Sequence, residues 1–229
     1  MTDETVQAIT EHYQKTCEIT YELWKERNRL FVFLVITSGI GLLLLLPVPE
    51  MNKLVVDAVV KLLGITDPAR ITQLYANFPL DIFLSAFLIV GFYLMQKLYS
   101  TNLSVSRNYQ YLGAMEGEIR QALGVSKESV SFTREGSFYW AKRSLMQELS
   151  KWYYIVVILI VLLPFQILKL INDLSSKNWI MFGVDTLLTI LTLFFFAGYA
   201  LSAIRMDVGK LPPPVSKPAA SGALPSKDN

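Results

Sequence analysis

The sequence predicts an all-α integral membrane protein with four spanning helices and helical extensions on the cytoplasmic side. Three observations lead to this prediction: four long apolar stretches, a composition that is 52% hydrophobic and 17% charged, and an uneven distribution of Lys and Arg. A helix rises about 1.5 Å per residue, so about 20 residues cross the hydrocarbon core of a bilayer. Soluble domains contain fewer apolar and more charged residues, and the mean hydropathy here is +0.39.

The four apolar stretches are residues 30–48, 78–98, 152–168 and 179–204. The first contains no charged residue and follows a polar segment, so we expect it to remain as a membrane anchor. The second is the weakest because Asp81 lies near its start, but a tilted helix accommodates a short apolar centre.

The distribution of the 21 Lys and Arg residues predicts the orientation. The N-terminal segment, the connection between the second and third stretches and the C-terminal segment share one side of the membrane. The opposite side carries only Lys53, Lys61, Arg70, Lys169 and Lys177. Because positive residues concentrate in cytoplasmic connections, we expect a multi-pass protein of the cell membrane with both termini in the cytoplasm.

Residues 1–29 are expected to form a cytoplasmic amphipathic helix. Apolar and aromatic residues recur there at steps of three or four: Val6, Ile9, Tyr13, Cys17, Tyr21 and Trp24. Residues 30–98 form the first transmembrane hairpin, with an extracytoplasmic loop at 49–77. Within this loop, residues 51–66 are expected to form a short amphipathic helix on the membrane surface, which Asp67 and Pro68 end.

Residues 99–151 are expected to form a cytoplasmic helical hairpin that packs with the N-terminal helix. Leu112, Met115 and Ile119 keep helical spacing, Gly124 is a plausible C-cap, and helix resumes near Phe138. Residues 152–204 form the second transmembrane hairpin, with a link at 172–177. Residues 205–229 are rich in Pro, Ser and Ala and are expected to be a disordered cytoplasmic tail.

Several function classes are disfavoured by the sequence. It has no phosphate-binding loop, no nucleophile elbow and no zinc-protease motif, so we expect no enzyme activity and no cofactor. One Cys and one His exclude an intrachain disulfide and a Cys/His zinc cluster. The net charge of +2 gives no reason to expect binding to nucleic acid.

Polar residues inside the apolar stretches form the first candidate site. Asp185, Thr189 and Thr192 lie on one face of the fourth stretch. Ser85 and Gln166 lie at comparable depth in the second and third stretches, and Asp81 lies near the outer interface. Such residues usually face the protein interior or water, which suggests a lining for ions or protons. Hydrogen bonding between helices is the alternative.

Polar and aromatic residues of the cytoplasmic hairpin form the second candidate site. The candidates for contact with a partner are Arg107, Tyr111, Glu116, Arg134, Glu135 and Trp140. A solvated helix face with surface ion pairs is the alternative interpretation.

The layout, with YELWKERNR before the first stretch and YLGAMEGEI after the second, resembles small membrane effectors of bacterial defence systems, including the SLATT type. Four spans depart from the two-span SLATT pattern, so no family is assigned and no site residues are carried over.

The leading hypothesis is a non-enzymatic membrane effector or scaffold that acts through its cytoplasmic helices. Its expected partners are the bilayer, further copies of the chain and a cytoplasmic protein. The second hypothesis is a channel or transporter for an ion or small solute. A membrane-bound lipid enzyme ranks last because no motif supports it.

Overall fold

The structure is a computed structural model that describes residues 3–46, 49–125 and 145–205. Within these ranges the chain is entirely helical, and four of its helices are long and apolar enough to cross a membrane. The prediction of an all-α chain with four candidate spans is therefore confirmed. The helices are α1 (Asp3–Leu45), α2 (Pro49–Leu63), α3 (Pro68–Asn77), α4 (Leu80–Ala122), α6 (Leu145–Ser175) and α7 (Trp179–Arg205).

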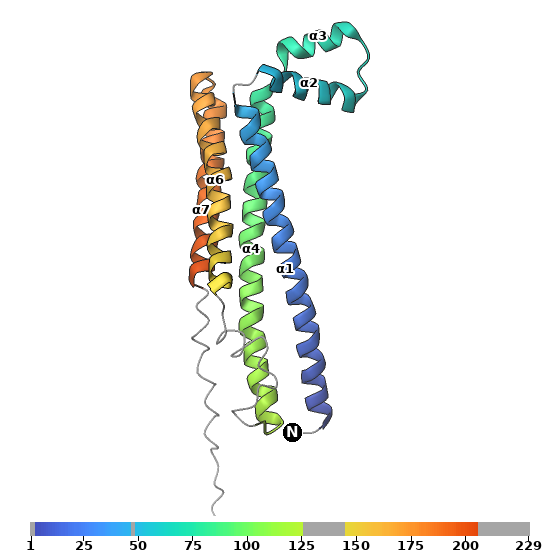
Figure 1. The fold of residues 1–229 in the computed structure, drawn as a ribbon, viewed down its shortest axis with the longest axis vertical. Coiled ribbons are helices and arrows are strands. Elements are labelled where there is room, and N and C mark those ends of the chain that lie inside the picture. Colours follow the sequence, from blue (N-terminus) through green and yellow to red (C-terminus); the bar gives the residue numbers. More distant parts are fainter. Residues whose placement is uncertain (1–2, 47–48, 126–144, 206–229) are drawn as a thin grey trace, which may run out of the picture.

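Helices α1 and α4 are the longest elements, with 43 residues each. At 1.5 Å per residue each is about 65 Å long, roughly twice the thickness of a hydrocarbon core. They run side by side along their whole length, and α6 and α7 cover only the part nearer to α2 and α3 (Figure 1). The other part of the α1–α4 pair extends beyond the bundle as a two-helix extension.

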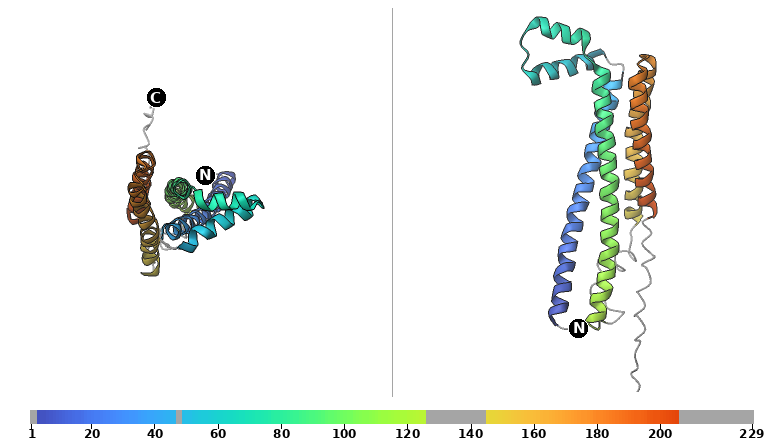
Figure 2. Two further views of the ribbon diagram at one scale, coloured as in Figure 1. Left: turned by 90° about the horizontal axis from the view of Figure 1, so that it is seen from above. Right: turned by 180° about the vertical axis from the view of Figure 1, so that it is seen from behind.

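The four long helices are arranged as a ring in the order α1, α4, α7, α6. Each packs against its two neighbours in this order, and α4 and α6 touch less closely across the ring. Seen from above, α6 and α7 form one row beside α1 and α4 (Figure 2). Residues that point to the centre of the ring therefore meet side chains from the other helices.

Two apolar clusters fill the interior of this ring. The larger cluster takes buried side chains from all four helices, among them Leu34, Leu98, Ile158 and Tyr199. The smaller cluster lies nearer to α2 and α3 and combines Leu44, Leu84 and Leu88 with Phe165. In a bilayer, close packing and hydrogen bonds rather than exclusion of water hold helices together.

The segment between α1 and α4 contains two helices rather than the single helix expected at residues 51–66. Asp67 and Pro68 begin the second helix: the Asp67 carboxylate accepts a hydrogen bond from Ala69 N at 3.0 Å, and Pro68 occupies the first turn. In α3, the Tyr75 hydroxyl donates to Asp57 of α2, and this bond raises the pKa of Tyr75 above its ordinary value of 10.0. The two helices project sideways from the end of the bundle (Figure 1).

Helix α6 runs to Ser175, beyond residue 168, where the sequence predicted the third span to end. The link to α7 is therefore shorter than the expected 172–177, and it turns through Lys177, whose φ is 57°. Lys169 was assigned to the outer connection from the sequence, and this assignment is wrong because the residue lies inside α6 and is fully buried.

Helix α4 ends as the sequence predicted, with Gly124 at a φ of 61° in the left-handed region that favours glycine. Residues 126–144 lie outside the described ranges, and the expected polar turn and the restart of helix near Phe138 lie there. The expected tail lies outside them too, apart from Arg205. The described part of the extension beyond the bundle consists of α1 and α4.

Candidate functional site: a buried ion cluster between three helices

Lys169 is the centre of a charged cluster inside the four-helix bundle. Its ammonium group lies 2.8 Å from Asp185 Oδ2 and also contacts Asp173 Oδ1. Lys169 and Asp185 are 0% exposed and Asp173 is 1% exposed. Ser85 of α4 donates from its hydroxyl to the same Asp185 oxygen at 2.7 Å. Side chains of α4, α6 and α7 thus meet at one point.

Local helix geometry explains how these residues come together. Lys169 and Asp173 are four residues apart in α6, so they lie on the same face of that helix. Asp185 is six residues after the start of α7, and Lys169 is six residues before the end of α6, which places both about 9 Å from their helix ends. The short link between these helices sets the two faces against each other at the same depth.

The cluster contains more negative than positive charge. Two carboxylates share one ammonium group, and Asp173 Oδ2 and Asp185 Oδ1 have no hydrogen-bond partner among the described residues. A buried ion pair gains its Coulomb energy at a desolvation cost of several kcal/mol per ion. The second carboxylate has no cation of its own, so burying it in ionised form would cost more free energy than burying a balanced ion pair. This imbalance is the main chemical property of the site.

Further polar side chains lie next to the cluster in the bundle interior. Gln166 is one turn before Lys169 on α6 and is 1% exposed, and Thr189 is one turn after Asp185 on α7. Gln166 Oε1 and Thr189 Oγ1 have no partner within the described ranges, and the same holds for Ser38 Oγ on α1. These atoms, one amide oxygen and two hydroxyl groups, are buried without a hydrogen-bond partner among the described residues.

The polar interior is bounded on both sides along the bundle axis. Towards α2 and α3, Asn172 donates to Asp81 Oδ1 at 2.7 Å, and Asp81 is partly exposed. In the other direction, the larger apolar cluster, with Leu34, Leu98 and Ile158, fills the space between the helices. The ion cluster thus lies in the half of the bundle near α2 and α3, beside the smaller apolar cluster, and the larger apolar cluster lies in the other half.

The structure places the six residues proposed from the sequence in different surroundings. Ser85 and Asp185 are in direct contact, and Gln166 and Thr189 flank them. Thr192 is buried, but its hydroxyl donates to Leu188 O of its own helix at 2.7 Å. Asp81 contacts Asn172 instead of the cluster.

Sequence reasoning missed Lys169 and Asp173 because their charges were taken as the end of the third span. The signal that would have found them is the pair of opposite charges at a spacing of four residues, directly after an uncharged apolar run. Such a pair neutralises itself, so a helix can continue through it inside a bilayer.

The second set of proposed residues lies along the α1–α4 extension. Glu116 is 3% exposed and accepts a hydrogen bond from the Tyr13 hydroxyl at 2.9 Å, so it joins α1 to α4 instead of facing solvent. Tyr111 is partly exposed, and its hydroxyl lies 3.0 Å from His12 Nε2. Arg107 is exposed. Arg134, Glu135 and Trp140 lie outside the described residues.

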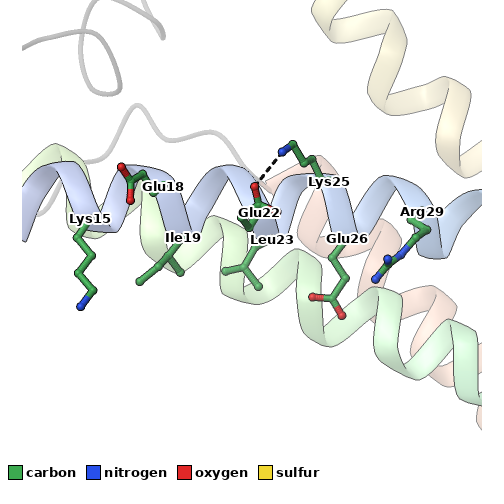
Figure 3. A pocket seen from close by; sticks show the side chains of 8 residues that line it. All are labelled: Lys15, Glu18, Ile19, Glu22, Leu23, Lys25, Glu26 and Arg29. Atoms are coloured by element: carbon green, nitrogen blue, oxygen red, sulfur yellow. Dashed lines mark hydrogen bonds and ion pairs between the residues drawn. The ribbon is translucent and has the colours of Figure 1, made fainter.

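A shallow hollow lies along the flank of α1 in this extension (Figure 3). The side chains that line it all belong to α1: Lys15, Glu18, Ile19, Glu22, Leu23, Lys25, Glu26 and Arg29. The lining carries charges of both signs, and Lys25 pairs with Glu22 at 2.8 Å as a solvent-exposed ion pair. Such pairs contribute little free energy. The hollow offers a charged surface without converging groups for a small ligand.

The described residues contain no group of three or more His, Cys, Asp or Glu side chains that is suited to hold a metal ion. The ion cluster brings one ammonium group and two carboxylates together where three helices meet. In the comparisons with known proteins, no family model, no curated protein and no solved structure matched this chain.

Proposed function

We propose that this chain is a non-enzymatic multi-pass membrane protein that binds a small cation or proton at the Lys169–Asp173–Asp185 cluster and moves it across the bilayer. The observation that carries this proposal is a single buried ammonium between two buried carboxylates. Ionisable residues inside a membrane are costly and usually belong to ion pathways or proton relays. A structural role alone would be served equally well by a balanced pair.

The apolar cluster between this site and the α1–α4 extension favours a gated path over an open pore. Leu34, Leu98 and Ile158 pack against one another between the helices in that half of the bundle, and the Asn102–Ser202 hydrogen bond joins α4 and α7 there. The ion would reach the cluster from the α2–α3 end, past Asp81, and a rearrangement of the four helices would release it on the other side. By the distribution of Lys and Arg, the α2–α3 end faces away from the cytoplasm.

The experiment that tests this function is a flux assay on purified protein in liposomes with a proton or sodium gradient. The wild-type protein is expected to give a flux, and Asp185→Asn is expected to reduce it at least about tenfold because the variant loses the excess negative charge. Glu118→Gln makes the same chemical change at an exposed position of α4 and should leave the flux unchanged. Correctly inserted wild-type protein in flux-free vesicles would refute transport.

A second candidate function is that of a scaffold or effector that self-associates through the α1–α4 extension. The specific observation in its favour is a group of apolar side chains on α1 that neither α4 nor α6 covers. Ile19 is 49% exposed and Tyr21 is 58% exposed, although both lie before the first apolar stretch. Exposed apolar groups of this kind, rimmed by charge, often mark protein contacts, and the partner proposed is a second copy of this chain.

Point variants test this candidate better than a deletion of the N-terminal helix, which would also uncover the buried Glu116. Replacing both Ile19 and Tyr21 with Ser is expected to lower the oligomer mass that light scattering measures in detergent. The matched control is Glu18→Gln, which alters the neighbouring charged surface without removing apolar area. An unchanged mass for the double variant would exclude this surface as a contact between copies.

A further inference from the structure

The net charge of the ion cluster indicates which kind of ion it binds. With both carboxylates ionised and Lys169 protonated, the cluster carries a net charge of −1 in a volume that no solvent reaches. The described part of α1 that lines the bundle, residues 30–45, has no titratable group. On α4 the titratable group facing this region is Asp81, which is itself acidic and is hydrogen-bonded to Asn172. None of these groups supplies the missing positive charge.

A metal ion fits this surplus poorly. The Lys169 ammonium already occupies the position next to Asp185 Oδ2, and it would repel a second cation placed among the same oxygens. A dehydrated metal ion also needs a shell of several oxygen ligands. A proton needs only one of the unpartnered carboxylate oxygens, either Asp173 Oδ2 or Asp185 Oδ1.

We propose that the cluster binds one exchangeable proton at neutral pH, shared between Asp173 and Asp185, so that Lys169 is balanced by a single carboxylate. Both carboxylates contact the same ammonium group and each has one oxygen without a partner among the described residues, so the proton is assigned to the pair and not to one residue. Binding forms an O–H bond on one of the two carboxylates, and release returns the proton to water on the side of Asp81. The inference deepens the proposed function by naming the proton as the ion, and it rests on that function in treating this cluster as the working site.

Infrared spectroscopy measures this proton without any need for transport. A protonated carboxyl absorbs at a frequency separate from that of a carboxylate, and exposed Asp and Glu side chains are ionised at pH 7 because their ordinary pKa is about 4. The wild-type spectrum in detergent at pH 7, minus that of Asp173→Asn, should therefore show one protonated carboxyl that the variant lacks. Asp185→Asn should give the same loss, since either variant leaves a balanced pair.

The variant Lys169→Met gives the opposite result. Without the ammonium, both carboxylates must take up a proton to remain neutral, so the carboxyl band should rise from one group to about two. Glu18→Gln, at an exposed position, should give no difference at pH 7. Circular dichroism and gel filtration identify variants that do not fold. If Lys169→Met does not fold, Asp173→Asn and Asp185→Asn still test whether the cluster binds a proton.

Three outcomes overturn the inference. The first is that the wild type lacks the infrared band of a protonated carboxyl group at pH 7, and the second is that both Asp variants retain this band. The third is that sodium ions abolish the band, which would show that a metal cation binds in the place of the proton. The flux assay separates this inference from the proposed function: a carboxyl band without flux keeps the proton site and refutes transport. Proton flux without the band refutes the bound proton.

Discussion

Gly41 of α1 lies at close range to Phe165 of α6. A Cβ atom built there would lie 2.5 Å from Cε2 of Phe165, whose ring is 1% exposed and packs in the smaller apolar cluster. The close approach of α1 to α6 therefore depends on this glycine. Gly39, two residues earlier on the same helix, would place its Cβ 3.9 Å from Val161, which is ordinary contact.

We predict that Gly41→Ala destabilises the protein by about 1–3 kcal/mol because the Phe165 ring has no free space to enter. Gly39→Ala is the matched control, and its effect should stay within about 1 kcal/mol, the difference in helix propensity between the two residues. Thermal unfolding in detergent, followed by circular dichroism, measures both. Equal melting temperatures for the two variants would contradict the packing described for α1 and α6.

The residues of the ion cluster show what sequence reasoning can and cannot find at this scale. Ser85 and Asp185 were proposed as members of one site because each was a polar residue in an apolar stretch at comparable depth, and the structure brings them into contact. Lys169 and Asp173 were not proposed, since charged residues were read as the end of a span. The opposite charges four residues apart indicate that α6 can continue through them, but the sequence of α6 does not show that Asp185 of α7 faces them.

Side-chain hydrogen bonds join helices α4 and α7 at two levels. Near α2 and α3 the contact is the Ser85–Asp185 hydrogen bond, and near the end of α7 Asn102 donates to Ser202 Oγ at 2.9 Å. Gly198 of α7 also allows the Tyr99 ring of α4 to pack closely against α7. A Cβ atom at Gly198 would lie 3.1 Å from this ring. Gly198 and Ser202 are four residues apart, the small-residue spacing that permits close helix packing.

A double-mutant cycle on Asn102→Ala and Ser202→Ala tests the second contact. The coupling free energy is expected to be about 0.6 kcal/mol, and at most about 1.7 kcal/mol, the range found for hydrogen bonds between helices in membranes. Asn102→Ala alone should also lower the melting temperature, because Asn102 is 2% exposed and the variant loses the hydrogen bond to Ser202. A coupling energy of zero would show that the two side chains do not interact in the folded protein.

Element boundaries were predicted well where strong local signals exist and poorly elsewhere. Gly124 ends α4 as its sequence position suggested, since few other residues adopt its backbone conformation. Helix α3 was missed because Asp-Pro was taken as a stop signal, although an Asp followed by Pro also begins a helix. The buried face of the N-terminal helix also differs from the apolar face that the sequence predicted. Thr16 and Thr20 are buried, whereas Tyr21 and Trp24 are exposed.

At the scale of the whole molecule, four apolar stretches were enough to predict four long helices, because length and hydropathy are properties of each segment alone. The ring order of the helices was beyond reach, since it depends on which faces complement each other. The same holds for the position of the ion cluster beside the smaller apolar cluster, in the half of the bundle near α2 and α3.

The orientation in the membrane can be tested with single cysteines in a Cys17→Ser background. Ser126→Cys and Ser221→Cys are expected to resist a membrane-impermeant thiol reagent in intact cells and to react after permeabilisation, because the distribution of Lys and Arg predicts a cytoplasmic location for both. Thr72→Cys, on the exposed surface of α3, should react from outside. Labelling of Ser126→Cys but not Ser221→Cys in intact cells would mean that either α4 or α6 does not cross the membrane.

Because α4 is one continuous helix, a change of its tilt at one end displaces its other end. The helix carries Ser85 at one end and Glu116 near the other, with no described break between them. The two residues are about 45 Å apart along the axis, so a tilt of about 5° that pivots near Ser85 displaces the far end by about 4 Å. A small change in how α4 sits against Asp185 is thereby magnified at the other end of the protein, where Tyr13 and its helix would have to follow.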